Sequence, residues 1–273
     1  MKFICYVKKE IFTFLLCWMH ITCAMIEKPM VIIIPSFNNA RWYKVNLNSV
    51  FRQKYTNYRV VYIDDCSTDD TYELVQKYLH EHQLADRVVL VSNNKNVGAL
   101  ANLYNAIHQL TDTTIVVTVD GDDALANENV LSRVNEAYAD PNVWMAYSQF
   151  IQWPSMERGW NKACSKESID MATDRGLSPS HLRTFYAKLF KQIQLEDLLY
   201  EGEFFTMTWD MAIMLPMIEM ARNDHVRFIP EVLYAYNSNN PISDHRKSRL
   251  LQQHLDDVIR LKKRYEPLTH LFD

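Results

Sequence analysis

Three carboxylates stand within four residues at Asp120-Gly121-Asp122-Asp123, directly after the apolar run 114–119. Hard divalent cations such as Mg²⁺ and Mn²⁺ prefer oxygen ligands, and Mg²⁺ is often held by one or two carboxylates together with substrate phosphates. A cation bound in this way acts as a Lewis acid and stabilises the charge on a departing diphosphate. Taken alone, however, the tetrapeptide fits a solvated turn equally well, because Asp and Gly are common turn residues.

A second acidic pair, Asp64-Asp65, follows the β-branched run 58–63. If both runs are strands of one parallel sheet, their carboxyl ends meet at the same edge, where ligands bind in α/β proteins. Negative charge gathered there is costly unless a cation neutralises it. The shared position therefore favours a metal site over a simple turn at 120–123.

The rest of the chain has the pattern of a sheet that can position these groups. From residue 30 onward, apolar runs alternate with helical stretches, which is typical of an α/β fold with a Rossmann-like, mostly parallel sheet and flanking helices. The strands are predicted over 31–34, 58–63, 87–91, 114–119 and 143–153, and the helices between them over 42–53, 71–82, 97–110 and 127–139. Beyond residue 154 we predict helices over 182–194, 208–222 and 247–265 and a strand over 226–236.

Composition narrows the class of protein. A length of 273 residues with 48% hydrophobic residues suits one α/β domain with a sizeable core. The net charge of -4 argues against nucleic acid as a partner, because that binding depends on clustered Lys and Arg. Of five cysteines, no pair has metal-ligand spacing, and Cys66 and Cys164 are expected to be unpaired.

The first 29 residues are predicted to form a segment separate from the α/β domain, which begins at residue 30. Two lysines precede an apolar run over 11–26, and residues 22–24 resemble a small-residue cleavage site. This pattern indicates a signal sequence or a short hydrophobic anchor, since the run is shorter than the ~20 residues that span a bilayer. Membrane association or a secretory location is expected if the segment is real. A start of translation at Met25 or Met30 would instead give a cytoplasmic protein.

Four motifs occur in a recognisable order: Val31-Ile32-Ile33-Ile34-Pro35-Ser36-Phe37-Asn38, Asp64-Asp65-Cys66-Ser67-Thr68-Asp69, Asn96-Val97-Gly98 and Asp120-Gly121-Asp122-Asp123. Together they resemble the inverting family 2 glycosyltransferases of GT-A fold. The resemblance implies transfer of a sugar from a nucleotide-diphosphate donor, with a UDP-sugar favoured, to a hydroxyl of a glycan, protein or lipid acceptor. It also implies a nucleotide-sugar-binding half over 30–153 and an acceptor-facing half over 154–273.

The resemblance assigns roles to residues of these motifs. It implies that Asp65 accepts a hydrogen bond from the base, that Asp120 approaches the ribose, and that Asp122 holds Mn²⁺ or Mg²⁺ with support from Asp123. Cys66 stands where the family usually has Gly, which would alter the turn. The implied nucleotide-sugar-binding residues are Pro35, Ser36, Phe37, Asn38, Asp65, Gly98, Asp120 and Asp122.

Inverting transfer also needs a general base to take the proton of the acceptor hydroxyl. In the family this base is often the Asp of a Glu-Asp pair at a helix start, and Asp210 is the residue here that matches it. The Glu is replaced by Trp209, and an Asp in a first helical turn is also favoured by the helix dipole alone. Glu201 and Glu203 are the alternative bases.

Three later residues are weighed as further ligands. Some GT-A enzymes supply a late histidine to the metal, so His245 is the candidate third ligand, with a solvated loop histidine as the alternative. His181 is expected to have no ligand role. Arg183 could contact a phosphate or the acceptor, but its default position is the surface.

Two other functions are considered. A nucleotidyltransferase would carry a Gly-rich basic loop after the first strand, and 35–38 lacks it. A degenerate binding module that keeps the fold and the donor site but has lost turnover stays open, because of the replacement at Trp209.

Overall fold

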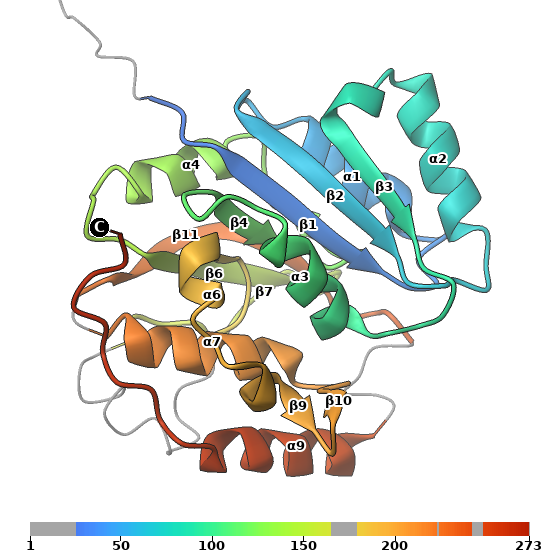
Figure 1. Cartoon of the computed structure of the whole chain (residues 1–273). Coiled ribbons are helices and arrows are strands. Elements are labelled where there is room, and N and C mark those ends of the chain that lie inside the picture. The colour runs from blue at the N-terminus through green and yellow to red at the C-terminus, as the bar shows by residue number, and fades with distance from the viewer. Residues whose placement is uncertain (1–25, 165–178, 223, 242–247, 273) are drawn as a thin grey trace, which may run out of the picture.

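The structure is a computed structural model that describes residues 26–164, 179–222, 224–241 and 248–272 (Figure 1). The elements of the amino-terminal part are β1 (Met30–Ser36), α1 (Tyr43–Phe51), β2 (Tyr58–Asp64), α2 (Thr71–Glu81), the 3-10 helix η1 (Ala85–Arg87), β3 (Val88–Ser92), α3 (Ala99–His108), β4 (Ile115–Thr118), β5 (Ala124–Leu125), α4 (Val130–Ala137) and β6 (Met145–Trp153). The following elements are β7 (Glu157–Arg158), β8 (Arg183–Tyr186), α6 (Ala187–Phe190), the 3-10 helix η2 (Leu195–Leu198), β9 (Leu199–Tyr200), β10 (Glu203–Phe204), α7 (Trp209–Met220), β11 (Val226–Asn237) and α9 (Arg249–Leu261).

One sheet organises the described residues. Its strand order is β3-β2-β1-β4-β8-β6-β11-β5, and β7 pairs with β6. Strands β1 to β4 run parallel to their neighbours in that group, and β11 runs parallel to β6, whereas β8 is antiparallel to both β4 and β6. The carboxyl ends of β1, β2 and β4 therefore meet at one edge, as the alternating pattern of the sequence predicted.

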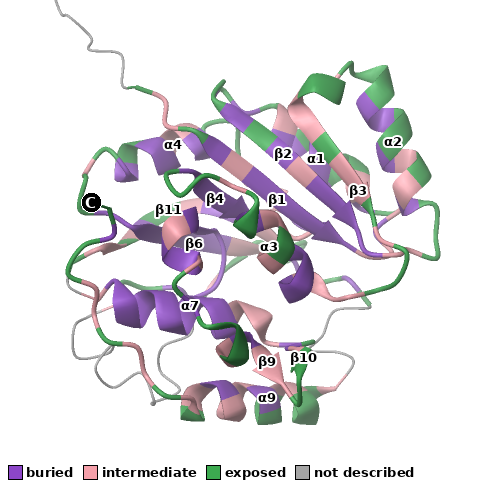
Figure 2. Ribbon diagram, viewed as in Figure 1, coloured by how far each residue is buried: buried purple, intermediate pink, exposed green. Residues whose placement is uncertain are grey.

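Helices cover both faces of this sheet. Helix α3 lies in front of β1 and β4 in the view of Figure 1, whereas α1 lies behind the sheet. Strands β1 and β4 are almost entirely buried (Figure 2), and Ile32, Ile33, Val116 and Val117 have no exposed surface. These continuous apolar runs are what a parallel strand covered on both faces requires.

Helix α7 is the buried helix of the second half. Met211, Met214, Met217 and Met220 are each at most 4% exposed, and α7 packs against both α6 and α9. A helix that is apolar on every side belongs in the interior, so core packing accounts for the position of these methionines. The predicted helix 208–222 is thus confirmed, and its first turn carries Asp210.

The predicted helix over 182–194 is wrong. Arg183–Tyr186 forms strand β8, inserted between β4 and β6, and only Ala187–Phe190 is helical. All four residues of β8 are buried, so the segment has no polar face to expose. Its position in the middle of the sheet overrides the helical pattern of the local sequence.

The amino-terminal prediction concerns residues 1–29, of which 1–25 lie outside the described residues. Within 26–164, 179–222, 224–241 and 248–272, no helix has both the length and the apolar character needed to cross a bilayer. The proposed anchor or signal sequence stays a prediction.

Candidate active site

A cleft of about 320 Å³ opens at the carboxyl ends of β1, β2 and β4. Helix α7 forms the opposite part of its wall through Trp209 and Asp210. Residues of all four sequence motifs thus face one space with the start of a helix from the second half of the chain. The residues of our predicted set that line the cleft are Pro35, Phe37, Asp65, Gly98, Asp120, Asp122, Asp123 and Asp210.

Ser36 and Asn38, which were predicted to bind the nucleotide, are not among the described lining residues and instead hold the loop after β1 in place. The Oγ of Ser36 accepts hydrogen bonds from Tyr62 Oη at 2.8 Å and from Asn39 Nδ2 at 3.0 Å. The Oδ1 of Asn38 accepts a bond from Thr68 N at 2.8 Å. These bonds hold the loop in place, and Pro35 and Phe37 of the same loop line the cleft.

Gly121 packs the acidic turn directly against this loop. Its backbone nitrogen donates to Pro35 O at 3.1 Å. A Cβ at position 121 would lie 2.6 Å from both Ser36 Oγ and Asn39 Nδ2, closer than real Cβ atoms approach other atoms. The turn and the loop can therefore meet in this way only because residue 121 has no side chain.

Asp65 fixes the start of α3 from the end of β2. Its buried carboxylate accepts bonds from Asn93 Nδ2 at 2.7 Å and from the backbone nitrogens of Val97 at 3.0 Å and Gly98 at 2.8 Å. Gly98 has a φ of 87°, a region that favours glycine. Cys66 also adopts a positive φ, of 62°, so the turn keeps the backbone expected of the glycine that the family usually has there.

Asp123 is the innermost carboxylate of the acidic turn. Its Oδ2 accepts a bond from Tyr234 Oη at 2.7 Å, and its Oδ1 accepts one from Asn237 N at 2.6 Å. Burial, and then the nearby carboxylates of Asp122 and Asp120, raise the pKa of Asp123 well above its ordinary value. Both oxygens are thus engaged by strand β11, which makes Asp123 a support for the turn.

Asp122 has a more open position. It is partly buried, and its Oδ2 accepts a bond from Asn240 Nδ2 at 2.6 Å. Burial raises the pKa of Asp122, although the bond from Asn240 opposes this shift. Within the described part of the chain, no Lys or Arg forms an ion pair with Asp122 or Asp123. As far as the described residues go, the cleft wall therefore carries negative charge without a Lys or Arg partner at this point, which favours a bound cation.

Arg183 is among the residues that line the same cleft and is buried there, although we expected it at the surface. Its side chain is 2% exposed, with Nη2 at 3.1 Å from Asp210 Oδ2 and Nη1 at 3.8 Å from Asp120 Oδ2. The guanidinium also lies over the Trp209 ring, 4.8 Å from its centroid. Burial lowers the pKa of Arg183, but the two carboxylates outweigh it and raise the pKa above the ordinary value, so the residue is charged.

His181 is the second residue whose place the sequence missed. It is buried and stacked on Tyr234, with ring centroids 4.4 Å apart. Burial, and then the charge of Arg183, lower the pKa of His181 well below its usual range, so its ring is neutral at neutral pH. Its Nδ1 has no hydrogen-bond partner among the described residues and lies 3.8 Å from Asp120 Oδ2.

Neutral imidazole and carboxylate are the forms that bind metals. Asp120, Asp123 and His181 offer ligand atoms that lie within 4.8 Å of one another, close enough to share one ion. This group contains one of the three predicted metal ligands, Asp123. His245, another of them, lies outside the described residues. We expected no ligand role for His181 because a helix was predicted to begin at residue 182. The structure instead has strand β8 there, and His181 lies next to Asp120.

The alternative bases lie elsewhere. Glu201 and Glu203 belong to the β9–β10 hairpin and are not among the described residues that line the cleft. Of the three candidate bases, Asp210 is therefore the one that lines the cleft.

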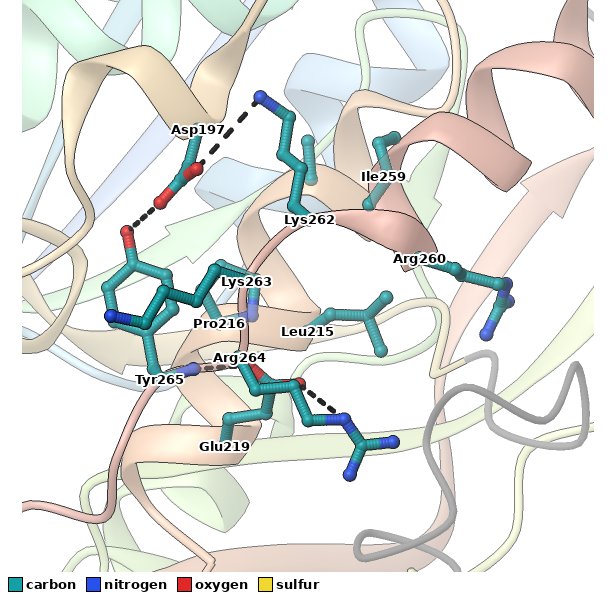
Figure 3. A pocket seen from close by; sticks show the side chains of 11 residues that line it. Asp197, Leu215, Pro216, Glu219, Ile259, Arg260, Lys262, Lys263, Arg264 and Tyr265 are labelled. Atoms are coloured by element: carbon teal, nitrogen blue, oxygen red, sulfur yellow. Dashed lines mark hydrogen bonds and ion pairs between the residues drawn. The ribbon is translucent and has the colours of Figure 1, made fainter.

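A second pocket, between α7 and α9, is too small for a substrate (Figure 3). It holds about 30 Å³, about the space of one water molecule. Its two carboxylates already have partners: Glu219 accepts a bond from Tyr265 N at 2.9 Å, and Asp197 accepts one from Tyr265 Oη at 2.6 Å. These contacts attach the carboxyl-terminal segment to α7 and leave the larger cleft as the candidate active site.

Two curated relatives match part of this chain. A processive diacylglycerol beta-glycosyltransferase from Mycoplasma genitalium is 27% identical over 112 residues, which are 41% of this chain and 32% of that protein. The poly(ribitol-phosphate) beta-N-acetylglucosaminyltransferase TarS from Staphylococcus aureus is 31% identical over 101 residues, which are 36% of this chain and 17% of that protein. The matched region thus spans a third or less of the length of these relatives.

Solved structures extend the likeness beyond the matched sequence. S. aureus TarS 1–349 in complex with UDP-GlcNAc has a TM-score of 0.58 at 18% identity, over 81% of this chain and 61% of that one. Mannosyltransferase PcManGT from Pyrobaculum calidifontis, in complex with GDP-Man and Mn²⁺, has a TM-score of 0.58 at 20% identity, over 88% and 66%. These similarities confirm the predicted single-domain α/β fold of GT-A type.

The family follows from a match along the sequence itself. The family model described as Glycosyl transferase family 2 matches residues 31–199, more than half of the chain. The matched residues include the four motifs on which the resemblance rested, and they also include His181 and Arg183. The chain therefore belongs to glycosyl transferase family 2, the family that its motifs predicted.

Proposed function

We propose that this chain is an inverting glycosyltransferase that moves a sugar from a nucleoside-diphosphate donor, with a UDP-sugar favoured, to an acceptor hydroxyl. The observation that carries the proposal is the single cleft in which Asp65, the acidic turn 120–123 and Asp210 face one another. Each step of such a transfer needs one of these groups: recognition of the nucleotide, stabilisation of the leaving diphosphate, and removal of the acceptor proton.

The donor is proposed to bind at the amino-terminal side of the cleft. Asp65 is held by three hydrogen bonds, and a carboxylate has further lone pairs that can accept a bond from a base. Asp120 would face the ribose, and Pro35, Phe37 and Gly98 would form the wall around the nucleotide. Support comes from TarS and PcManGT, which share the fold and were solved with UDP-GlcNAc and GDP-Man.

The metal is proposed to be Mn²⁺ or Mg²⁺ at Asp122, with Asp123 behind it. Arg183 already compensates the charge of Asp120, whereas no described cation pairs with Asp122. His181 offers an unpartnered ring nitrogen on the Asp120 side, but the guanidinium of Arg183 opposes a second positive charge there. A metal bound at Asp122 would supply Lewis-acid stabilisation of the leaving diphosphate.

Asp210 is proposed as the general base. Its Oδ1 accepts a bond from Met211 N at 3.0 Å and its Oδ2 accepts one from Arg183, so the carboxylate has a fixed orientation at the cleft wall. From there it would take the proton of the acceptor hydroxyl while that oxygen attacks the anomeric carbon. The acceptor itself would approach from the half over 154–273, and its class, whether glycan, protein or lipid, stays a prediction.

The proposal is tested by incubating the purified protein with a panel of UDP- and GDP-sugars and measuring release of the nucleoside diphosphate. We expect release from at least one donor in Mn²⁺ or Mg²⁺ and its loss on addition of EDTA. Tight binding of UDP without release from any donor would favour the degenerate binding module instead. Release that is unaffected by EDTA would contradict the metal site.

A further inference from the structure

Arg183 enters the function proposed so far only as the partner of two carboxylates in the cleft. Arg183 bridges two carboxylates that come from different parts of the fold, Asp210 at the start of α7 and Asp120 at the end of β4. We propose that Arg183 is a positioning residue, which orients the carboxylate of Asp210 toward the acceptor and prevents its repulsion by Asp120. This inference rests on the proposed function and adds to it a residue that acts through the base.

Arg183 is among the residues that line the cleft, but almost none of its side-chain surface is exposed. The side chain is 2% exposed, and its Nε and Nη1 are buried with no hydrogen-bond partner among the described residues. Five N–H donors in a fixed planar fork would normally be satisfied when they are buried. A buried guanidinium with unsatisfied donors destabilises the folded protein, so its presence points to a function that needs a guanidinium at this place.

The surroundings fix the guanidinium in one place. Strand β8 pairs Arg183 with Thr118 of β4 on one side and with Tyr147 of β6 on the other. The head of the side chain lies over the Trp209 ring. The backbone of Arg183 is held in the centre of the sheet, so its guanidinium has little freedom to move. It therefore also restricts the motion of the Asp210 carboxylate that it binds.

The orientation matters because Asp210 stands at the first turn of α7 with its side chain 28% exposed. One oxygen receives the Met211 amide and the other receives Arg183, which together select one rotamer. Without the guanidinium, the carboxylates of Asp210 and Asp120 would lose the cation that they share and would repel each other more strongly. A base that is displaced by about 1 Å loses much of its effect on rate.

The test is a double-mutant cycle between Arg183 and Asp210. The rate of UDP release is measured with the donor that the wild-type protein uses best, and UDP affinity is measured by calorimetry. We expect Arg183→Met to lower kcat about 100-fold with UDP affinity changed less than about threefold, since its hydrogen bond is to Asp210 and its contact with Asp120, the proposed ribose residue, is longer, at 3.8 Å. In the Asp210→Asn background the same substitution should change kcat less than about threefold, because residues that act as one unit are not additive.

Azide provides a readout that a damaged fold would not give. As an anion, azide attacks the anomeric carbon while the bond to the diphosphate oxygen breaks and its electron pair leaves with UDP, so no proton has to be removed. Arg183→Met and Asp210→Asn are therefore both expected to form glycosyl azide at a rate well above their rate with water. Arg183→Lys keeps the charge but not the planar fork, and its kcat should lie between those of Arg183→Met and the wild type.

The matched control is Arg227→Met. Arg227 forms an exposed ion pair with Asp140 at 2.9 Å and is not among the described residues that line the cleft. Its replacement should leave kcat and UDP affinity unchanged.

Two results would overturn the inference. One is a wild-type kcat in Arg183→Met, and the other is effects of Arg183→Met and Asp210→Asn that multiply in the double variant. If Arg183→Met does not fold, wild-type kcat in a folded Arg183→Lys has the same meaning. A wild-type protein that uses no donor refutes the proposed function instead.

Discussion

Replacing Asp210 by asparagine is expected to lower the rate of sugar transfer about 10²- to 10⁴-fold, the usual contribution of a general base. Asparagine has nearly the same shape, and its one oxygen can accept the bond from either Met211 N or Arg183, while its amide nitrogen cannot accept the other. It cannot take a proton at neutral pH, so the loss should appear in kcat. UDP affinity should stay near the wild-type value, because the nucleotide is proposed to bind at Asp65 and Asp120.

The measurement is steady-state release of the nucleoside diphosphate together with UDP binding by calorimetry. Asp140→Asn is the control, because Asp140 is an exposed acidic residue whose carboxylate pairs with Arg227 outside the cleft lining. Turnover that is unchanged in Asp210→Asn would remove Asp210 from the role of base. A loss of UDP binding equal to the loss of rate would place Asp210 at the donor instead.

Replacing Asp122 by asparagine is expected to abolish the response to metal and to stabilise the metal-free protein. Asparagine keeps an oxygen that can accept the bond from Asn240 but removes the charge that a cation would neutralise. Mn²⁺ should therefore raise the midpoint of thermal unfolding of the wild-type protein and have no effect on the variant. Metal-dependent donor turnover should fall to the level that the wild type shows in EDTA.

The direction of the stability change follows from the pKa. Burial raises the pKa of Asp122 above its value in the unfolded chain, so the folded protein holds that proton more tightly. Stability that this group provides at low pH is lost as the pH rises through the raised pKa, and at neutral pH the metal-free protein carries the charge as a cost. Asp122→Asn removes this cost, worth about 1 kcal/mol or roughly 2–4 °C for a protein of this size.

This stability prediction is measured by thermal unfolding in EDTA at neutral and at mildly acidic pH. The variant should melt above the wild type at neutral pH, and the difference should shrink as the pH falls toward the raised pKa of Asp122. A variant that melts below the wild type in EDTA would show that Asp122 is compensated in the metal-free protein. That result would contradict the uncompensated charge on which the metal proposal rests.

The sequence predicted the amino-terminal half of the fold because its signals there are local. Strand β1 is a continuous apolar run, and each acidic motif begins at the end of a strand or within two residues of it. Parallel strands place their carboxyl ends at one edge, so the meeting of Asp65 with Asp120 follows from the order of elements alone. Helix α7 was similarly predicted, within the helix expected over 208–222.

The parts that the sequence did not predict depend on contacts between distant segments. Strand β8 is short and is defined by its two antiparallel neighbours, β4 and β6, which no local pattern reveals. Once its segment was read as part of a helix, His181 and Arg183 had no reason to face Asp120. The bonds from Tyr234 to Asp123 and from Asn240 to Asp122 bring residues more than 100 positions away onto the acidic turn, again through the sheet.

The most direct test of the donor and metal site is a crystal structure of the wild-type protein grown with UDP and Mn²⁺, with the metal located by its anomalous scattering. We predict one Mn²⁺ bound to Asp122 and to the diphosphate, with the uracil beside Asp65 and the ribose beside Asp120. UDP bound outside this cleft, or UDP in the cleft with Mn²⁺ bound away from Asp122 and the diphosphate, would contradict the account.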